Sequence, residues 1–408
     1  MDQSNIPAPP AVLFNKTTPP NVVTLVLIAG IGALSMNIFL PSLPAMAAYF
    51  EADYSVVQLA ISAYLAVTGA MQLLVGPLSD RFGRRPVMIG GLLIFLFATL
   101  GCILSEDVGW FLGFRMLQAA VATGMVLSRA VVRDMVEPAK AASMIAYVTM
   151  GMALIPMVSP MIGGVLDQAF GWKASFIFAF LFGVAVLLLV WFDMGETNKN
   201  RSASLTAQFN SYPELIKSHR FWGYTLVAAF ASGAFFAFLG GGPYVASQVL
   251  GIPSDEVGLY FGMIAVGYMI GNFVSGRISE RMGINRMMLL GSLISAVGTM
   301  LGLALFAAGL HYPLSLFGPI MLVGFGNGLS LPSANAGMVS VRPQLSGSAS
   351  GLGGAVMIGG GAALAAITGS LLSPERGAYP LLGMMALSSG FGILAAIYVI
   401  RRSQYLQD

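Results

Sequence analysis

The sequence contains little charge and almost no residue able to support metal or redox chemistry. Lys, Arg, Asp and Glu make up 9% of the 408 residues, whereas a soluble domain carries about a quarter. The single cysteine, Cys102, excludes an intramolecular disulfide. Two histidines far apart in the chain, His219 and His311, provide no metal cluster. No nucleophile–base pair or phosphate-binding loop is visible, so we expect neither an enzyme nor a cofactor.

Apolar residues dominate instead. They account for 57% of the chain, and the mean hydropathy is +0.81. Too little polar surface remains to cover a water-soluble globule, and apolar runs of about 20 residues, the length that crosses a bilayer, recur along the sequence. We therefore predict an all-α polytopic membrane protein with twelve transmembrane helices, at about 22–44, 55–79, 86–105, 109–132, 142–166, 173–192, 220–247, 254–278, 285–308, 312–338, 345–371 and 378–401.

One long polar connection divides the predicted helices into two sets of six. It covers residues 193–219 and contains GETNKNRSASLTAQFNSYPE, which is typical of a linker. The predicted domains are an amino-terminal half over 22–192 and a carboxy-terminal half over 220–401. The proline-rich residues 1–21 are expected to be disordered and do not resemble a cleavable signal peptide, and residues 402–408 form a short tail.

Basic residues are distributed unequally between the two sides of this topology. With the amino terminus placed in the cytoplasm, only Lys173 and Arg376 among the loop cations fall outside, while Glu106, Asp107 and Asp255 occupy outer loops. Because cytoplasmic loops are enriched in Lys and Arg, both termini are predicted to be cytoplasmic. The net charge of +3 therefore reflects membrane topology and gives no indication of nucleic-acid binding.

A charged segment occurs twice, 200 residues apart. GPLSDRFGRRP covers residues 76–86, and GRISERMGINR covers residues 276–286. Glycine, serine, acidic and arginine positions coincide in the two copies. Two six-helix halves related by a parallel repeat are the architecture of a large class of secondary transporters.

Four motifs resemble those of one family. GPLSDRFGRRP resembles the signature loop between the second and third helices of the major facilitator superfamily, and FRMLQ, which ends at Gln118, resembles its fourth-helix motif. IPMVSPMIGG resembles the fifth-helix motif of its antiporters, and SMNIFLPSLP is similar to the first-helix motif of the bicyclomycin/chloramphenicol-resistance type. The resemblance implies the major facilitator fold and drug:proton antiport across a bacterial inner membrane. We expect a monomer whose partners are a small-molecule substrate, protons and lipid.

The resemblance implies two gating elements. The first is the charged loop, understood in the family to latch the halves on the cytoplasmic side, and we expect Asp134 to pair with Arg81 or Arg85. Arg84 and Arg85 as simple topology anchors remain an alternative. The second is the fifth helix, where prolines bend the chain and glycines permit close packing; Ser159 stands where a glycine is more usual. The predicted gating residues are Gly76, Asp80, Arg81, Gly83, Arg84, Arg85, Pro156, Pro160, Gly163 and Gly164.

The fourth predicted helix carries arginines on one face. Arg115, Gln118 and Arg129 share that face because they are 3 and 14 residues apart. A charged side chain inside a membrane helix faces water or a partner. Arg115 is our candidate for lowering the proton affinity of a nearby carboxylate or binding an anionic substrate group. A purely structural role, fixed by backbone carbonyls, is the alternative.

The predicted substrate-binding residues divide between the halves. Asn37, Tyr64, Arg115 and Gln118 are assigned to the amino-terminal wall of a central cavity, and Phe235, Phe236 and Asn327 to the other wall. Aromatic side chains suit apolar ligands of varied shape, and cavities form between such halves.

Asn37 departs from the family pattern, which has a carboxylate at this position. Asparagine does not titrate, which leaves three alternatives for proton coupling: it has moved to Asp134, it differs in kind, or it is weakened. Asp134 is our candidate for the coupling carboxylate, together with Arg115. Asp167 is a second candidate carboxylate. The predicted function is export of amphipathic, phenicol-like small molecules by proton antiport. The alternatives are an exporter of a metabolite such as a sugar, amino acid or siderophore, and a uniporter.

Overall fold

The computed structural model describes residues 13–16, 18, 20–135, 148, 155, 158–198, 212–342 and 346–404. All regular secondary structure in these residues is helical. This includes residues 158–170, which lie between α7 and α9. The elements are α1 (Val22–Asn37), η2 (Leu40–Ser42), α2 (Leu43–Tyr49), α3 (Tyr54–Val57), α4 (Leu59–Phe82), α5 (Arg84–Leu104), α6 (Val108–Leu117), η3 (Gln118–Val121), α7 (Ala122–Met135), α9 (Lys173–Asp193), α11 (Tyr212–Ile216), α12 (His219–Tyr244), η4 (Val245–Val249), α13 (Ser254–Met282), α14 (Ile284–Ala307), α15 (Pro313–Ser340), α16 (Ser346–Leu371) and α17 (Tyr379–Gln404).

Eleven stretches in the described part of the chain are long and apolar enough to cross a membrane. They correspond to the predicted spans except the fifth, where the described helical residues are 158–170. The fourth span is interrupted by the 3-10 turn η3 between α6 and α7. Helices predominate because a backbone in lipid has to satisfy its own hydrogen bonds. The prediction of an all-α membrane protein is confirmed.

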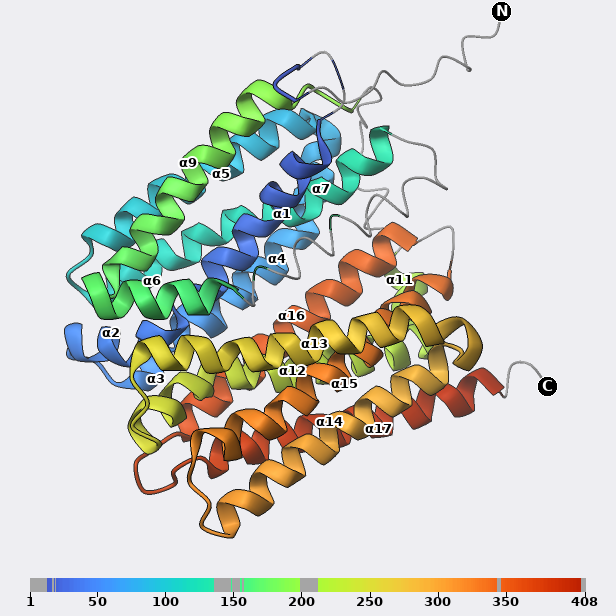
Figure 1. The fold of residues 1–408 in the computed structure, drawn as a ribbon. Coiled ribbons are helices and arrows are strands. Elements are labelled where there is room, and N and C mark those ends of the chain that lie inside the picture. The colour runs from blue at the N-terminus through green and yellow to red at the C-terminus, as the bar shows by residue number, and fades with distance from the viewer. Residues whose placement is uncertain are drawn as a thin grey trace, which may run out of the picture.

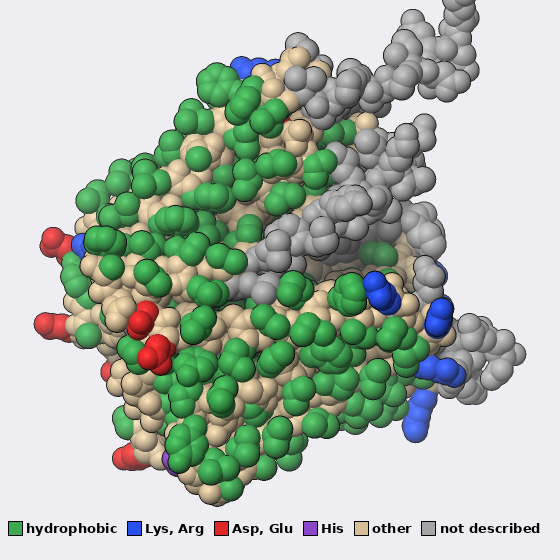
Figure 2. Space-filling view, viewed as in Figure 1, with side chains coloured by type: hydrophobic (Ala, Val, Ile, Leu, Met, Phe, Trp, Pro, Cys, Tyr) green, Lys and Arg blue, Asp and Glu red, His purple; other side chains and the backbone are tan. Residues whose placement is uncertain are grey.

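The helices form two bundles that lie side by side (Figure 1). α1 to α9 belong to the amino-terminal bundle, and α12 to α17 belong to the carboxy-terminal bundle. The start of α1 and the end of α17 lie at the same end of the molecule. Most visible Lys and Arg side chains gather there, and Asp and Glu side chains lie at the opposite end (Figure 2). We name these the basic end and the acidic end.

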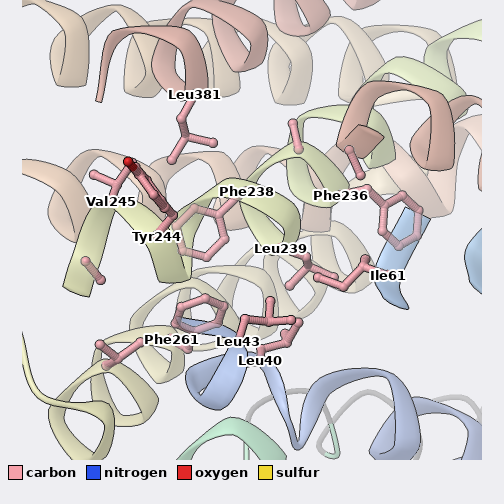
Figure 3. Packing of buried hydrophobic residues seen from close by; sticks show 14 of the residues in the cluster. Leu40, Leu43, Ile61, Phe236, Phe238, Leu239, Tyr244, Val245, Phe261 and Leu381 are labelled. Carbon is pink, nitrogen blue, oxygen red and sulfur yellow. The ribbon is translucent and has the colours of Figure 1, made fainter. Parts of the chain in front are cut away.

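A continuous apolar cluster joins the two bundles towards the acidic end. It contains Leu40 and Leu43 from η2 and α2 and Phe261 from α13, all of which are buried (Figure 3). Ile61 of α4 and Leu239 of α12 belong to the same cluster. Burying such side chains stabilises an arrangement by about 1.5–3 kcal/mol each. This cluster therefore holds the two halves together on the acidic side.

Two polar side chains of the amino-terminal half also cross to the other half. The hydroxyl of Tyr54 donates to the carbonyl oxygen of Gly240, 2.8 Å away. Nε2 of Gln58, which is fully buried, donates to the carbonyl oxygen of Ala365 at 2.8 Å. A Cβ atom at Gly240 or Gly369 would collide with the Gln58 amide. Gln58 therefore occupies a slot that exists because two residues of the facing helices have no side chain.

A buried carboxylate fastens the start of the chain to the end of α9. Asp193 is fully buried and accepts hydrogen bonds from the backbone N–H groups of Phe14 (2.8 Å) and Asn21 (2.9 Å) and from the hydroxyl of Thr24 (2.6 Å). The prediction of disorder over residues 1–21 is therefore wrong for the last part of that segment. The apolar pattern of α9 gave no sign that its terminal aspartate would recruit these donors.

We expect Asp193→Ala to destabilise the protein, because three donors, two of them on the backbone, lose their acceptor. An unpaired buried polar group costs about 1–3 kcal/mol. Thermal unfolding in detergent measures the effect, with Asp53→Ala as control because Asp53 is exposed and its side chain caps no helix. Equal midpoints for the two variants would contradict the role assigned to Asp193.

We expect Gly369→Ala to separate the halves at the acidic end, because the new methyl group displaces Gln58. Spin labels at Glu51→Cys and Gln248→Cys, both exposed positions on opposite halves, report the distance when Cys102 is replaced by alanine. Gly359→Ala is the matched control, since a Cβ atom there meets nothing within 4 Å. If the distance between the labels in Gly369→Ala equals that in the native protein, or if Gly359→Ala changes it equally, the Gln58 slot does not hold the halves together.

Candidate functional site

A cavity of about 280 Å³ lies between the two halves. Its wall is mainly apolar, and helices of both halves contribute to it. Five of the seven predicted substrate-binding residues line it: Asn37, Tyr64, Phe235, Phe236 and Asn327. Three further wall residues, Thr68, Tyr268 and Met357, were also expected from their positions in polar or apolar stripes of the predicted helices. The wall residues that the sequence did not indicate are Gly32, Ala33, Met36, Leu65, Val121, Ala122, Met125, Ser232, Leu239, Phe261, Ile264, Ala265, Gly324, Leu331 and Ile358.

The wall contains no Asp, Glu, Lys or Arg among the residues that the structure describes. Its polar groups are amides and hydroxyls. A mostly apolar cavity with a few polar groups is the usual form of a small-molecule site. Such a wall is suited to a small molecule that is largely apolar and has a few polar atoms.

Arg115 lies behind the wall, outside the cavity. Its side chain is fully buried, and its guanidinium group donates to the carbonyl oxygens of Ser35 (3.0 Å) and Ala60 (3.1 Å) and to the side chains of Ser35 and Gln118. Gln118 in turn donates to the hydroxyl of Thr99 at 2.7 Å. The expectation that Arg115 and Gln118 line the cavity is therefore wrong, because these hydrogen bonds direct both side chains into the amino-terminal bundle.

Arg115 nevertheless lies close to the cavity. Its guanidinium carbon is 4.0 Å from the ring centroid of Tyr64, which lines the wall, and 4.5 Å from the ring of Phe39. Cation–π contacts of this kind are favourable, and more so when desolvated. The hydrogen-bond acceptors found for Arg115 are all uncharged. Its positive charge is thus held by neutral oxygens and aromatic faces.

The charged loop at the basic end forms a compact network. Gly83 ends α4 with φ at +102°, a conformation that favours glycine, and Gly283 ends α13 with φ at +76° in the second copy. Nε of Arg84 bonds to the carboxylate of Asp134 at 2.9 Å. We predicted Arg81 or Arg85 as the partner of Asp134. That was wrong, because Arg85 stacks on the Trp191 ring and Arg81 lies on the ring of Phe82.

Glu196, at the start of the linker, completes this network, and sequence reasoning missed it. Its carboxylate accepts the backbone N–H groups of Arg84 (2.9 Å) and Arg85 (3.3 Å) at the start of α5. A carboxylate is favoured there by the unpaired N–H groups and the helix dipole. The next residue, Thr197, donates to Asp134 at 3.2 Å. A short acidic segment after an apolar helix was the available signal. The side chain of Asp80 lies outside the described residues.

The described part of the fifth helix touches both halves. A Cβ atom at Gly163 would collide with the carbonyl oxygen of Ile38, the residue that directly follows α1. A Cβ atom at Gly258 in α13 would collide with the carbonyl oxygen of Pro160. Residues 158–170 therefore pack closely against the first helix of their own half and against the opposite half. Gly164 is buried in this helix, and Pro156 lies outside the described residues.

The carboxylates occupy the two ends of the bundle. The side chain of Asp134 is 22% exposed, Asp167 is half-buried, and Asp193 is fully buried. Nineteen residues separate Arg115 from Asp134, which is roughly 28 Å along a helix. The two candidate coupling residues therefore do not form a local pair.

We expect Arg115→Met to lower the thermal midpoint, because oxygens of α1, α4 and η3 lose their donors while the side-chain volume is kept. Arg115→Lys should rescue only part of the loss, since one ammonium group does not reproduce the guanidinium fork. Each acceptor left unpaired costs about 1–3 kcal/mol. Arg277→Met is the control, because Arg277 is exposed. A midpoint for Arg115→Met equal to that of the control would contradict this role.

Comparison with known proteins places the chain among transporters. The family model described as Major Facilitator Superfamily matches residues 25–366 and, in a second match, 236–405. A chloramphenicol resistance protein of Pseudomonas aeruginosa is 33% identical over 72% of this chain and 71% of its own length. Multidrug resistance protein D of Escherichia coli is 28% identical over 88% of this chain and 91% of its own, and a bicyclomycin resistance protein homolog of Haemophilus influenzae is 28% identical over 93% and 97%.

Solved structures agree on the fold. An inward-facing bacterial homolog of the lysosomal transporter Spinster superposes with a TM-score of 0.71 at 17% identity, covering 94% of this chain and 96% of that one. The human organic anion transporter MFSD10 gives 0.70 at 18% identity, with 93% and 98% covered. The motifs, the two bundles and these matches agree: the chain belongs to the Major Facilitator Superfamily and has the major facilitator fold.

Proposed function

We propose that this protein exports amphipathic small molecules across a bacterial inner membrane in exchange for protons, by alternating access. The observation that carries the proposal is the uncharged, largely apolar cavity shared by the two halves. The resistance proteins among its relatives, named for chloramphenicol, bicyclomycin and multiple drugs, support it.

The apolar cluster and the Gln58 slot are contacts that have to break and reform during such a cycle. They join the halves on the acidic side, so the described conformation corresponds to one closed at that end. Rocking of one half against the other would expose the cavity there and close it at the other end. The tightly packed fifth helix, with Pro160, Gly163 and Gly164, is placed to limit leakage during the exchange.

The basic end is the cytoplasmic end in this proposal. The concentration of Lys and Arg there (Figure 2) follows the distribution that governs membrane insertion. Both termini would then be cytoplasmic, and the acidic end would face the periplasm. Release of a substrate at the acidic end is export.

Proton coupling is assigned to Asp134. Its carboxylate forms an ion pair with the side chain of Arg84 in the gating loop. Protonation of Asp134 would remove the charge attraction to Arg84 and loosen the contact between α7 and the start of α5. Arg115 would contribute by holding α1, α4 and α6 in one arrangement. The shape of the loop that responds to protonation of Asp134 would depend on Gly76, Arg81, Gly83 and Arg85.

We expect a proton pulse when chloramphenicol is added to everted vesicles that contain the protein. Asp134→Asn should abolish it, because the amide does not exchange a proton. Asn37→Asp should keep or increase the pulse, because it restores a carboxylate in the cavity. Collisional quenching of a pH-sensitive dye reports the flux, and Asp53→Asn is the matched control at an exposed aspartate.

A full pulse in Asp134→Asn would show that another carboxylate carries the proton, and Asp193→Asn would then be tested. A pulse that occurs only in Asn37→Asp would mean that the native chain is uncoupled and acts as a uniporter. Absence of flux from all variants would contradict proton-coupled export of such compounds, and a counterflow screen of sugars, amino acids and siderophores would test the alternative.

A further inference from the structure

Two asparagines in the cavity wall leave their amide oxygens without a hydrogen-bond partner. Nδ2 of Asn37 donates to the carbonyl oxygen of Ala33 at 2.7 Å, and Nδ2 of Asn327 donates to the carbonyl oxygen of Ala231 at 3.0 Å. A carbonyl oxygen only accepts, so in each side chain the nitrogen has to face it. Within the described part of the chain, both Oδ1 atoms are buried and unpaired.

Such atoms are unfavourable in an empty site. Asn37 and Asn327 are 1% and 4% exposed, so water compensates them poorly. A buried acceptor without a donor costs free energy that a bound donor recovers. Both residues belong to the cavity wall, Asn37 through α1 and Asn327 through α15. Each half of the transporter therefore contributes one amide oxygen that a ligand can satisfy, and the buried hydroxyl of Thr68 in the same wall also lacks a partner among the described residues.

The electrostatics of the cavity disfavour a charged ligand. A cation would find no carboxylate in the described wall and would lie near the positive charge of Arg115, 4.0 Å behind the ring of Tyr64. A like charge at short range in a medium of low dielectric constant is repulsive. An anion would face the two amide oxygens, which are themselves the negative ends of dipoles.

We propose that the cavity selects uncharged amphipathic molecules that carry at least two hydrogen-bond donors, one bound by Oδ1 of Asn37 and the other by Oδ1 of Asn327. This inference rests on the proposed function and names the substrate class of the same site. Because the acceptors belong to different halves, a molecule with both donors bridges the halves, whereas one without donors contacts only the apolar wall.

The test compares ligands as well as variants. The full-length protein in lipid nanodiscs is titrated with chloramphenicol, which has two hydroxyl groups and one amide N–H, and with its di-O-methyl ether, which lacks the hydroxyl donors. For the native protein we expect the ether to bind at least about tenfold more weakly, the effect of about one buried hydrogen bond. In the Asn37→Leu Asn327→Leu double variant, the affinities for chloramphenicol and its ether should differ by less than about twofold. A general loss of packing would weaken both ligands and would not remove the difference between them.

Asn272→Leu is the matched control. Asn272 also donates Nδ2 to the carbonyl oxygen four residues earlier, at 2.8 Å, but it does not line the cavity. The preference for chloramphenicol over its ether should persist in this variant. If the double variant does not fold, the ligand comparison in the native protein still decides. Equal affinity of the native protein for chloramphenicol and its ether overturns the proposal.

The charge selectivity is tested with tetraphenylphosphonium, an apolar cation without donors. We expect the native protein to bind it at least about tenfold more weakly than Asn37→Asp does, since the variant adds the missing carboxylate. Binding of this cation by the native protein as tightly as by Asn37→Asp overturns the charge selectivity. If the native protein binds none of these ligands, the substrate class is wrong. The proton-flux assay then decides separately whether the proposed export also fails.

Discussion

Among the residues that the structure describes, the buried guanidinium group of Arg115 has only uncharged hydrogen-bond acceptors, and the packing of the amino-terminal half depends on supplying them. The guanidinium group donates hydrogen bonds to oxygen atoms of α1, α4 and η3. Each hydrogen bond requires its acceptor oxygen to lie at a fixed position relative to the planar group. Losing one of these contacts would leave a charge in an apolar interior, which is costly. The three elements are therefore fixed relative to one another. Tyr64, whose ring covers the guanidinium, is held in the cavity wall by the same arrangement. A residue outside the cavity thus determines the shape and the electrostatics of its amino-terminal side.

The polar contacts that the proposed cycle would break lie towards the ends of the bundle. When such a contact breaks there, water can hydrogen-bond to the separated groups. At the basic end, Glu196 and Asp134 connect the linker, the charged loop and α7 through Arg84. Towards the acidic end, the contact between the halves relies on apolar side chains and two hydrogen bonds to carbonyl oxygens. Neutral contacts of this kind separate without exposing a bare charge. The division suits a transporter that opens and closes on both sides of a fixed central site.

The sequence predicts the fold well because its main signals are local. Apolar runs determine the helices, and the repeated GPLSDRFGRRP segment identifies both the family and the pairing of the halves. Five cavity residues were predicted because polar and aromatic residues inside membrane helices are conspicuous. Arg115 and Gln118 were misplaced because helical periodicity gives a face but not what that face meets. The partner of Asp134 and the role of Asp193 depend on contacts between segments 50 to 179 residues apart, which no local pattern records.

The contact between Asp193 and the start of the chain also limits the order of assembly. Its donors lie at Phe14, Asn21 and Thr24, and the carboxylate lies at the end of α9. The contact therefore forms only after the sixth span has left the ribosome, and it needs nothing from the carboxy-terminal half. The amino-terminal half can close on itself while the second half is still being synthesised. The Gln58 slot, by contrast, needs Gly240 of α12 and Gly369 of α16, so it forms only after the carboxy-terminal half has been made.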